Sequence, residues 1–139
     1  MHFEFSKAKA AHIALCRSGE RAAAALLFEK GYEVLARNFK RKSGEIDIVA
    51  RHGRALVFVE VKSKRSGRGR PAENLSDKQK SRIARAALTY LREIENPRVP
   101  YRFDLVEAVF QGRRLAELRH WQNHFFGLDT RRSRGRRPR

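Results

Sequence analysis

The spacing of apolar and polar residues predicts two helices. Apolar positions at helical intervals indicate a helix over residues 19–30, followed by Gly31 at the position where a left-handed residue commonly ends a helix. A second helix is predicted to begin after Ser76, where Gln79 three residues later completes the pattern of a capping box. Its apolar stripe runs to about Asn96-Pro97, where the proline favours termination.

Runs of β-branched and aromatic residues predict the strands. One strand is expected over residues 32–39, and a hairpin over 45–62 turns around His52-Gly53. A second hairpin begins with residues 101–110 and turns at Gln111-Gly112. The order helix, strand, hairpin, helix, hairpin predicts an α/β fold in which a central mixed sheet is flanked by helices.

The chain of 139 residues is long enough for one domain with a true core. We expect an N-terminal lead-in over residues 1–18, helical or loosely ordered, and the folded domain over 19–128. Residues 129–139 form a basic tail of low complexity that has nothing to bury, so disorder is expected there.

The charge balance narrows the range of partners. A formal net charge of +17 favours a polyanionic binding partner. Nucleic acid is the commonest such partner, and an anionic membrane surface is the next. The single cysteine excludes a disulfide framework and a cysteine-based zinc cluster. Because we find neither a signal peptide nor an apolar run of membrane-spanning length, we expect a soluble cytoplasmic protein without a membrane partner.

Charged residues occupy positions of the first hairpin that a buried strand would fill with apolar side chains. A turn at His52-Gly53 pairs Arg51 with Arg54, and the register then sets Glu60 opposite Glu45 with Asp47 as its diagonal neighbour. If side chains alternate strictly between the two faces of the hairpin, one face carries Asp47, Phe58, Glu60 and Lys62. The other face then carries Ile46, Ile48, Val57, Val59 and Val61.

Two carboxylates on adjacent strands suit a divalent metal ion. Asp47 and Glu60 would repel each other unless a proton or cation lies between them, and Mg²⁺ accepts one or two carboxylates while keeping several waters. Lys62 can orient or deprotonate a water, or stabilise charge that develops on a phosphate. An ordinary ion pair at a strand end is the alternative, but the opposed acid and the basic surroundings favour a site.

The hairpin segment GEIDIVARHGRALVFVEVKSK resembles the active-site hairpin of the PD-(D/E)xK nuclease superfamily. More narrowly it is similar to the YraN-like family, whose nearest-looking relatives are archaeal Holliday junction resolvases. The likeness extends from Gly19 to Val109 and includes GE at the first helix, NFK before the hairpin, KQK in the second helix and RFDLV in the later strand. Ile46 stands where the superfamily motif has its proline, as is usual in YraN-like sequences.

The resemblance implies a restriction-endonuclease-like fold and a role for each matching residue. Asp47, Glu60 and the carbonyl of Val61 would bind Mg²⁺ or Mn²⁺, and Lys62 would be the catalytic lysine. Glu20 matches a helix acid directed at the same metal, although a carboxylate stabilised by the helix dipole accounts for it equally well. Resolvase relatives act as dimers, so a homodimer is a further expectation.

The basic stretches that flank the hairpin suggest a surface that follows phosphates. The residues expected to contact nucleic acid are Arg41, Lys42, Lys64, Arg65, Arg68 and Arg70.

Several other polar and aromatic residues are better explained by structure than by function. Glu45 is an accessory ligand or, more simply, a strand-end acid, and Asp104 is best explained by a structural salt bridge. His120 and His124 have helical zinc-ligand spacing but no supporting motif, so structural roles are favoured. Trp121, Phe125 and Phe126 either stack on bases or, more simply, pack the C-terminal segment.

These observations lead to three hypotheses. The first is a metal-dependent endonuclease that cleaves phosphodiester bonds in DNA, by resemblance branched DNA. The second is a nucleic-acid-binding protein that has the nuclease fold but little or no turnover. The third is an RNA- or ribosome-associated basic protein in which the acids only pair with Lys62 and nearby arginines.

Overall fold

The computed structural model describes residues 2–67 and 75–125, with side chains from residue 6 onward. Arg68, Arg70, Phe126 and the predicted basic tail therefore lie outside the described residues. The elements are α1 (His2–Glu29), β1 (Glu33–Arg41), β2 (Gly44–His52), β3 (Ala55–Arg65), α2 (Asp77–Glu93), β4 (Tyr101–Gln111) and β5 (Arg114–Phe125).

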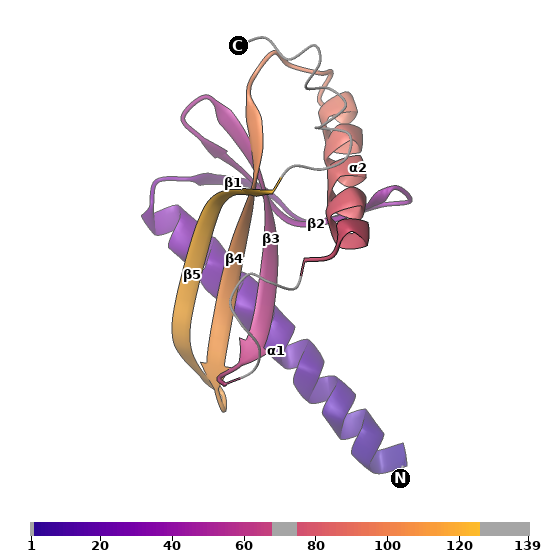
Figure 1. Ribbon diagram of the computed structural model, residues 1–139, viewed down its shortest axis with the longest axis vertical. Helices are drawn as coiled ribbons and strands as arrows, with labels where there is room; N and C mark the ends of the chain where they lie inside the picture. The colour runs from indigo at the N-terminus through magenta and orange to yellow at the C-terminus, as the bar shows by residue number, and fades with distance from the viewer. Residues whose placement is uncertain (1, 68–74, 126–139) are drawn as a thin grey trace.

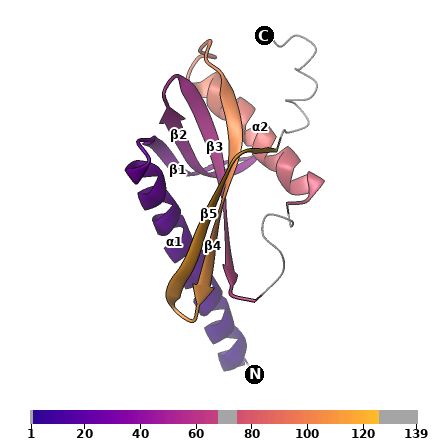
Figure 2. The same ribbon diagram turned by 60° about the vertical axis from the view of Figure 1, so that its left-hand side comes forward.

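The strands form one five-stranded sheet in the order β1-β2-β3-β4-β5. β3 and β4 are parallel, because α2 carries the chain back to the end of the sheet at which β3 begins. Every other neighbouring pair is antiparallel. The two helices lie on opposite faces of the sheet (Figures 1 and 2). The predicted α/β fold with a mixed sheet between helices is confirmed.

Each face of the sheet has its own hydrophobic core. The core beneath α2 contains Ile83, Ala87 and Leu91 of that helix against Phe58 and Phe103 of the sheet. The core beneath α1 joins Ala23 and Leu27 to Tyr32 and to the aliphatic residues Ile48, Ala50, Val57, Val59 and Val106. Two-sided burial explains why β3 and β4 consist of nearly continuous apolar residues apart from a few charges.

The first helix is longer than residues 19–30, the range that we predicted. It begins at His2, so Gly19 lies inside the helix rather than at its start. A Cβ atom at Gly19 would collide with Oγ of Ser63 and touch Ala108, which shows that α1 crosses β3 and β4 at van der Waals distance here. At the other end Gly31 has φ +89, as the prediction of a left-handed terminating residue requires.

The capping box of the second helix is confirmed in both directions. Ser76 Oγ accepts from the Gln79 amide at 3.1 Å, and Gln79 Oε1 accepts from the Ser76 amide at 3.0 Å. The helix ends at Glu93, earlier than predicted, because Glu95 and Asn96 both adopt positive φ values. The Asn96 amide donates to the Leu91 carbonyl at 2.7 Å, so a tight C-terminal turn replaces the last predicted helical turn.

Both hairpin turns lie one residue later than predicted. His52 pairs with Ala55, so the first turn is Gly53-Arg54 rather than His52-Gly53. Gln111 likewise pairs with Arg114 around Gly112-Arg113. In each case glycine takes the first turn position with φ near +60°, namely +61 for Gly53 and +63 for Gly112. The β2–β3 register consequently shifts by two residues, which preserves the face on which each β3 side chain lies.

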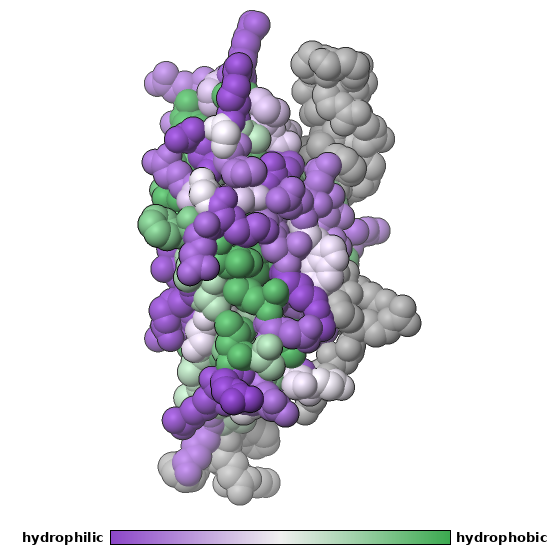
Figure 3. Space-filling view, turned by 90° about the vertical axis from the view of Figure 1, so that its left-hand side faces the viewer, coloured by the Kyte–Doolittle hydropathy of each residue, from purple (hydrophilic) through white to green (hydrophobic). Residues whose placement is uncertain are grey.

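The surface is mostly polar on the face at the left of Figure 1. There, hydrophobic side chains gather in a central strip bordered by hydrophilic ones (Figure 3). Among the described residues the most exposed large hydrophobic side chain is Phe28 of α1, at 76%. No helix in the described part of the chain is long and apolar enough to cross a membrane.

Candidate carboxylate site

The candidate site lies where β2 separates from β3. The last paired residues of the hairpin are Ile48 and Val59, and continuing the register by one step sets Asp47 opposite Glu60. At this point the Asp47 carboxylate accepts the Val61 backbone N–H at 2.8 Å. The Asp47 side chain thus accepts a β3 backbone N–H at the point where the pairing of β2 with β3 has ended. Asp47 and Glu60 are direct neighbours rather than the diagonal ones that we predicted.

The separation of the strands also changes the direction of side chains on β2. Ile46 and Val49 both pack in the core beneath α2, whereas Ile48 packs beneath α1. Strict alternation therefore fails around Asp47, and the prediction that Ile46 shares a face with Ile48 is wrong. The alternation on β3 is regular, with Phe58 facing α2 and Val59 facing α1.

The two carboxyl groups perturb each other strongly. Burial raises the pKa of Asp47 to about 6, with the Val61 N–H opposing and Glu20 adding to the rise. The pKa of Glu60 is raised to about 8, chiefly by burial and next by repulsion from Asp47. The two side chains are close enough to share a hydrogen bond when one of them is protonated. Near neutral pH the pair therefore retains a proton unless a cation replaces it.

Lys62 and Glu20 approach this pair from different elements. Lys62 follows Glu60 by two residues on β3, and its charge lowers the pKa of Glu60. Glu20 of α1 raises the pKa of Asp47, so its carboxylate lies within electrostatic range of the pair. Cys16, one helical turn before Glu20, has its pKa raised by burial and then by Glu20 and Asp47.

Glu45 contributes less to the site than the sequence allowed. Glu45 is exposed and lies opposite Lys40 in the register of β1 and β2. Its charge adds slightly to the raised pKa values of Asp47 and Glu60. Gln79 is engaged in the capping box of α2.

The ligand set consists of two carboxylates rather than a preformed cage. Within the described residues, no group of three or more histidine, cysteine, aspartate or glutamate side chains converges as a metal cluster. Asp47 and Glu60 nevertheless form no ion pair in this part of the chain, and burial first, then nearby acids, raises the pKa of each. Such a donor set fits Mg²⁺ or Mn²⁺, which bind through one or two carboxylates and retain waters. Val61 meets Asp47 through its N–H, and no contact tests the predicted role of its carbonyl.

The basic residues expected to contact nucleic acid have different environments. Arg41 forms a bidentate ion pair with Glu93 of α2 and lies over the Phe39 ring. Lys64 is largely covered and pairs with buried Glu107 at 3.0 Å. Lys42 and Arg65 are exposed.

The remaining buried acids are fully paired. Asp104 accepts from Arg102 at 3.0 Å, from His120 at 2.8 Å and from the Asn123 amide at 2.9 Å. Glu107 is held by Lys64 and Arg119. The structural salt bridge that we predicted for Asp104 is confirmed, and so is the structural role of His120.

The aromatic residues of the C-terminal strand are also accounted for by packing. Phe125 is buried against Phe103 with ring centroids 5.0 Å apart, and Trp121 lies beside His124.

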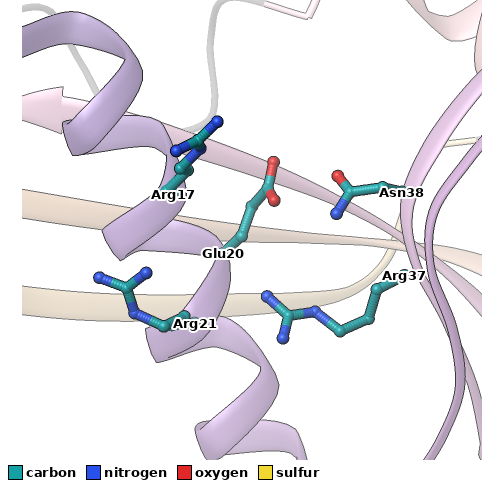
Figure 4. Close-up of a pocket in the computed structure, with 5 residues that line it drawn as sticks. All are labelled: Arg17, Glu20, Arg21, Arg37 and Asn38. Atoms are coloured by element: carbon teal, nitrogen blue, oxygen red, sulfur yellow. The ribbon is translucent and has the colours of Figure 1, made fainter. Parts of the chain in front are cut away.

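Sequence reasoning missed a depression between α1 and β1. It is lined by Arg17, Glu20, Arg21, Arg37 and Asn38 (Figure 4). Arg37 begins the basic stretch of residues 37–42 that precedes the hairpin, whereas Arg17 and Arg21 belong to no such stretch. The i, i+3, i+4 spacing of Arg17, Glu20 and Arg21 was the available signal, but it becomes visible only when the helix extends before Gly19.

Comparison with known proteins gives the family. The model of the uncharacterised protein family UPF0102 matches residues 19–108, which is more than half of the chain. The chain belongs to UPF0102. The UPF0102 protein of Chlorobaculum tepidum is 45% identical over 92 residues, covering 66% of this chain and 71% of the relative. That of Chlorobium phaeobacteroides is 38% identical over 117 residues, covering 80% and 93%. The UPF0102 match begins at Gly19 and includes Glu20, Asp47, Glu60 and Lys62.

Proposed function

We propose that this UPF0102 protein is a metal-dependent endonuclease of the PD-(D/E)xK superfamily that hydrolyses phosphodiester bonds in DNA. The observation that carries the proposal is the carboxyl pair of Asp47 and Glu60, which forms no salt bridge among the described residues although Lys62 lies within electrostatic range. In a chain of net charge +17, two neighbouring acids that no salt bridge neutralises call for a functional role. Binding of a divalent metal ion supplies one.

The carboxyl pair supports binding of Mg²⁺ or Mn²⁺. The Val61 N–H fixes one oxygen of Asp47, which leaves the other oxygen and the Glu60 carboxylate available as ligands. When bound, such an ion supplies Lewis acidity: it polarises a phosphoryl oxygen and lowers the pKa of a bound water. Because both carboxyl pKa values are raised, binding at neutral pH displaces the proton that the pair otherwise retains.

Lys62 supplies the positive charge that the reaction needs. Its ammonium group lies within electrostatic range of Glu60, and it can donate hydrogen bonds to a phosphoryl oxygen on which negative charge develops. In the hydrolysis that we propose, water oxygen bonds to phosphorus while one phosphorus–oxygen ester bond breaks. The leaving sugar oxygen gains a proton, and the water loses one.

The proposed substrate is DNA, with branched DNA favoured by the resemblance to Holliday junction resolvases. The large positive charge supports a polyanionic substrate in general. The same resemblance supports a homodimer.

The test compares cleavage by purified wild-type protein with cleavage by site variants. Four-way junction, flap and single-stranded DNAs are incubated with Mg²⁺ or Mn²⁺. We expect Asp47→Ala and Glu60→Gln to lower the cleavage rate by at least about a hundredfold, and Lys62→Ala by a similar factor. Glu117→Gln is the matched control, because Glu117 is an exposed acid of β5 that pairs with Arg119.

Cleavage that continues at the wild-type rate in Asp47→Ala and Glu60→Gln would exclude this site. Wild-type protein that binds these DNAs but yields no product with either metal would favour the second hypothesis, a binding protein with the nuclease fold.

A further inference from the structure

The depression between α1 and β1 brings three arginines together from two elements. Arg17 and Arg21 lie one turn apart on α1, and Arg37 reaches the same space from β1. The hollow has a volume of about 350 Å³ and is open to solvent. In Figure 4 the Glu20 side chain lies between Arg17 on the helix and Arg37 and Asn38 on the strand, while Arg21 extends from the next turn of the helix and points away from Glu20.

The arginines of this depression are not used for structural ion pairs. The salt bridges among the described residues involve Arg41, Arg51, Arg102 and Arg119, and none of the three that line the hollow. Arg21 donates only to Ser18 at 3.3 Å. The three positive charges exceed the single negative charge of Glu20 in the same space, and a phosphate group can neutralise the excess. The planar fork of arginine matches the oxygens of a phosphate group.

Asn38 adds a neutral polar group to the same space. It has φ +54, a left-handed conformation that asparagine tolerates better than most residues. Its side-chain amide can donate a hydrogen bond to a phosphate oxygen without adding charge.

Glu20 connects the depression to the carboxyl pair. It lines the hollow, and its charge raises the pKa of Asp47. Arg37 is paired across β1 with Ile48, the residue that follows Asp47. The hollow between α1 and β1 therefore lies near Asp47.

We propose that Arg17, Arg21, Arg37 and Asn38 form a phosphate-binding subsite that holds a backbone phosphodiester of the nucleic acid beside Asp47 and Glu60. This assignment rests on the proposed function for the identity of the ligand. It differs from the flanking basic stretches in that the arginines line a hollow, where they outnumber the one acid, Glu20, and form no salt bridge in the described part of the chain.

The experiment measures binding of a short fluorescent DNA duplex and a four-way junction in EDTA, where no hydrolysis takes place. The test variant is Arg17→Gln with Arg21→Gln and Arg37→Gln. The matched control is Arg54→Gln with Arg113→Gln and Arg114→Gln, which removes the same charge from exposed hairpin ends outside the depression. Circular dichroism checks that both variants are folded, and Arg37→Gln alone serves if the triple variant is not.

We expect the test variant to bind about tenfold more weakly than the control. Its slope of log affinity against log salt should be smaller than the control slope by about 1 for each phosphate contact that is lost. Replacing the three arginines with lysine should also weaken binding, because the charge remains while the fork geometry is lost. Equal affinities and equal slopes for test and control variants would overturn the subsite.

The binding result is separate from the fate of the proposed hydrolysis. If the test variant loses binding while wild-type protein cleaves no DNA with any metal, the subsite stands and the nuclease proposal fails. If wild-type protein cleaves DNA and both triple variants bind alike, the nuclease proposal stands and the subsite is wrong.

Discussion

Two pairs of acids on adjacent parts of the sheet have opposite surroundings. Asp104 and Glu107 of β4 are 0% and 2% exposed. Arg102 and His120 hold Asp104, and Lys64 and Arg119 hold Glu107. Burial raises the pKa of Asp104, but hydrogen bonds from His120, the Asn123 amide and Arg102 outweigh it, so that the pKa is lowered. For Asp47 and Glu60 burial raises both pKa values, and the opposing effects of the Val61 N–H and of Lys62 do not outweigh it.

The difference separates structural acids from candidate catalytic ones. An acid that stabilises the fold is surrounded by donors that favour its charged form, and removing it leaves those donors unpaired. An acid pair that the protein leaves without cations costs stability in the free protein. Both pairs consist of buried carboxylates on strands. The groups that contact each carboxylate therefore distinguish a structural acid from a candidate catalytic one.

The largest expected effect is on stability, and it should have opposite signs at the two pairs. Asp104→Asn removes the charge that Arg102 and His120 share, and should lower the free energy of unfolding by about 3 kcal/mol. Asp47→Asn keeps an oxygen for the Val61 N–H and removes the repulsion with Glu60. It should leave stability unchanged or raise it by about 1 kcal/mol at pH 8.

Chemical denaturation of both variants in EDTA measures these changes. A loss of stability in Asp47→Asn as large as that in Asp104→Asn would mean that both acids are structural, and the contrast would disappear.

A smaller effect is expected from metal ions, because only the pair without cations can gain from them. Saturating Mg²⁺ or Mn²⁺ at pH 8 should stabilise wild-type protein by about 1–3 kcal/mol. Glu60→Gln should abolish the gain, whereas Glu117→Gln should retain it. Thermal unfolding with and without EDTA provides the measurement, and equal stabilisation of the three proteins would place the metal elsewhere.

The pH dependence of stability should show the smallest change. The pKa values of Asp47 and Glu60 are raised to about 6 and about 8, so the folded protein favours their protonated forms. Their contribution is full below the unfolded values near pH 4 and is lost as pH rises through the folded values. In EDTA, stability should therefore fall by about 1–2 kcal/mol between about pH 5 and pH 9.

Glu60→Gln should flatten this decline, while Glu117→Gln should keep it. Asp104 does not interfere, because its lowered pKa means that its contribution is lost only as pH falls below about 4. A decline of the same size in Glu60→Gln would assign the pH dependence to other groups.

Local chemistry was sufficient to predict much of this molecule. The capping box at Ser76, the left-handed residue at Gly31 and the alternation along β3 each depend on a few neighbouring residues, and the structure confirms them. The proximity of Asp47 and Glu60 was also predictable, because a shift of two residues in a hairpin keeps the same face. The predicted register itself was wrong because glycine took the first turn position instead of the second.

By itself, the sequence determined the order of elements, the basic character of the chain and the acids that meet at the end of one hairpin. Only the tertiary structure decided which acids receive cations and which do not. Asp104 and Asp47 both occupy apolar strands. Arg102 lies two residues before Asp104 on β4, whereas His120 and the Val61 N–H are supplied by neighbouring strands. The arginine-lined depression likewise required α1 to pass β1, because contacts between distant segments depend on packing rather than on local pattern.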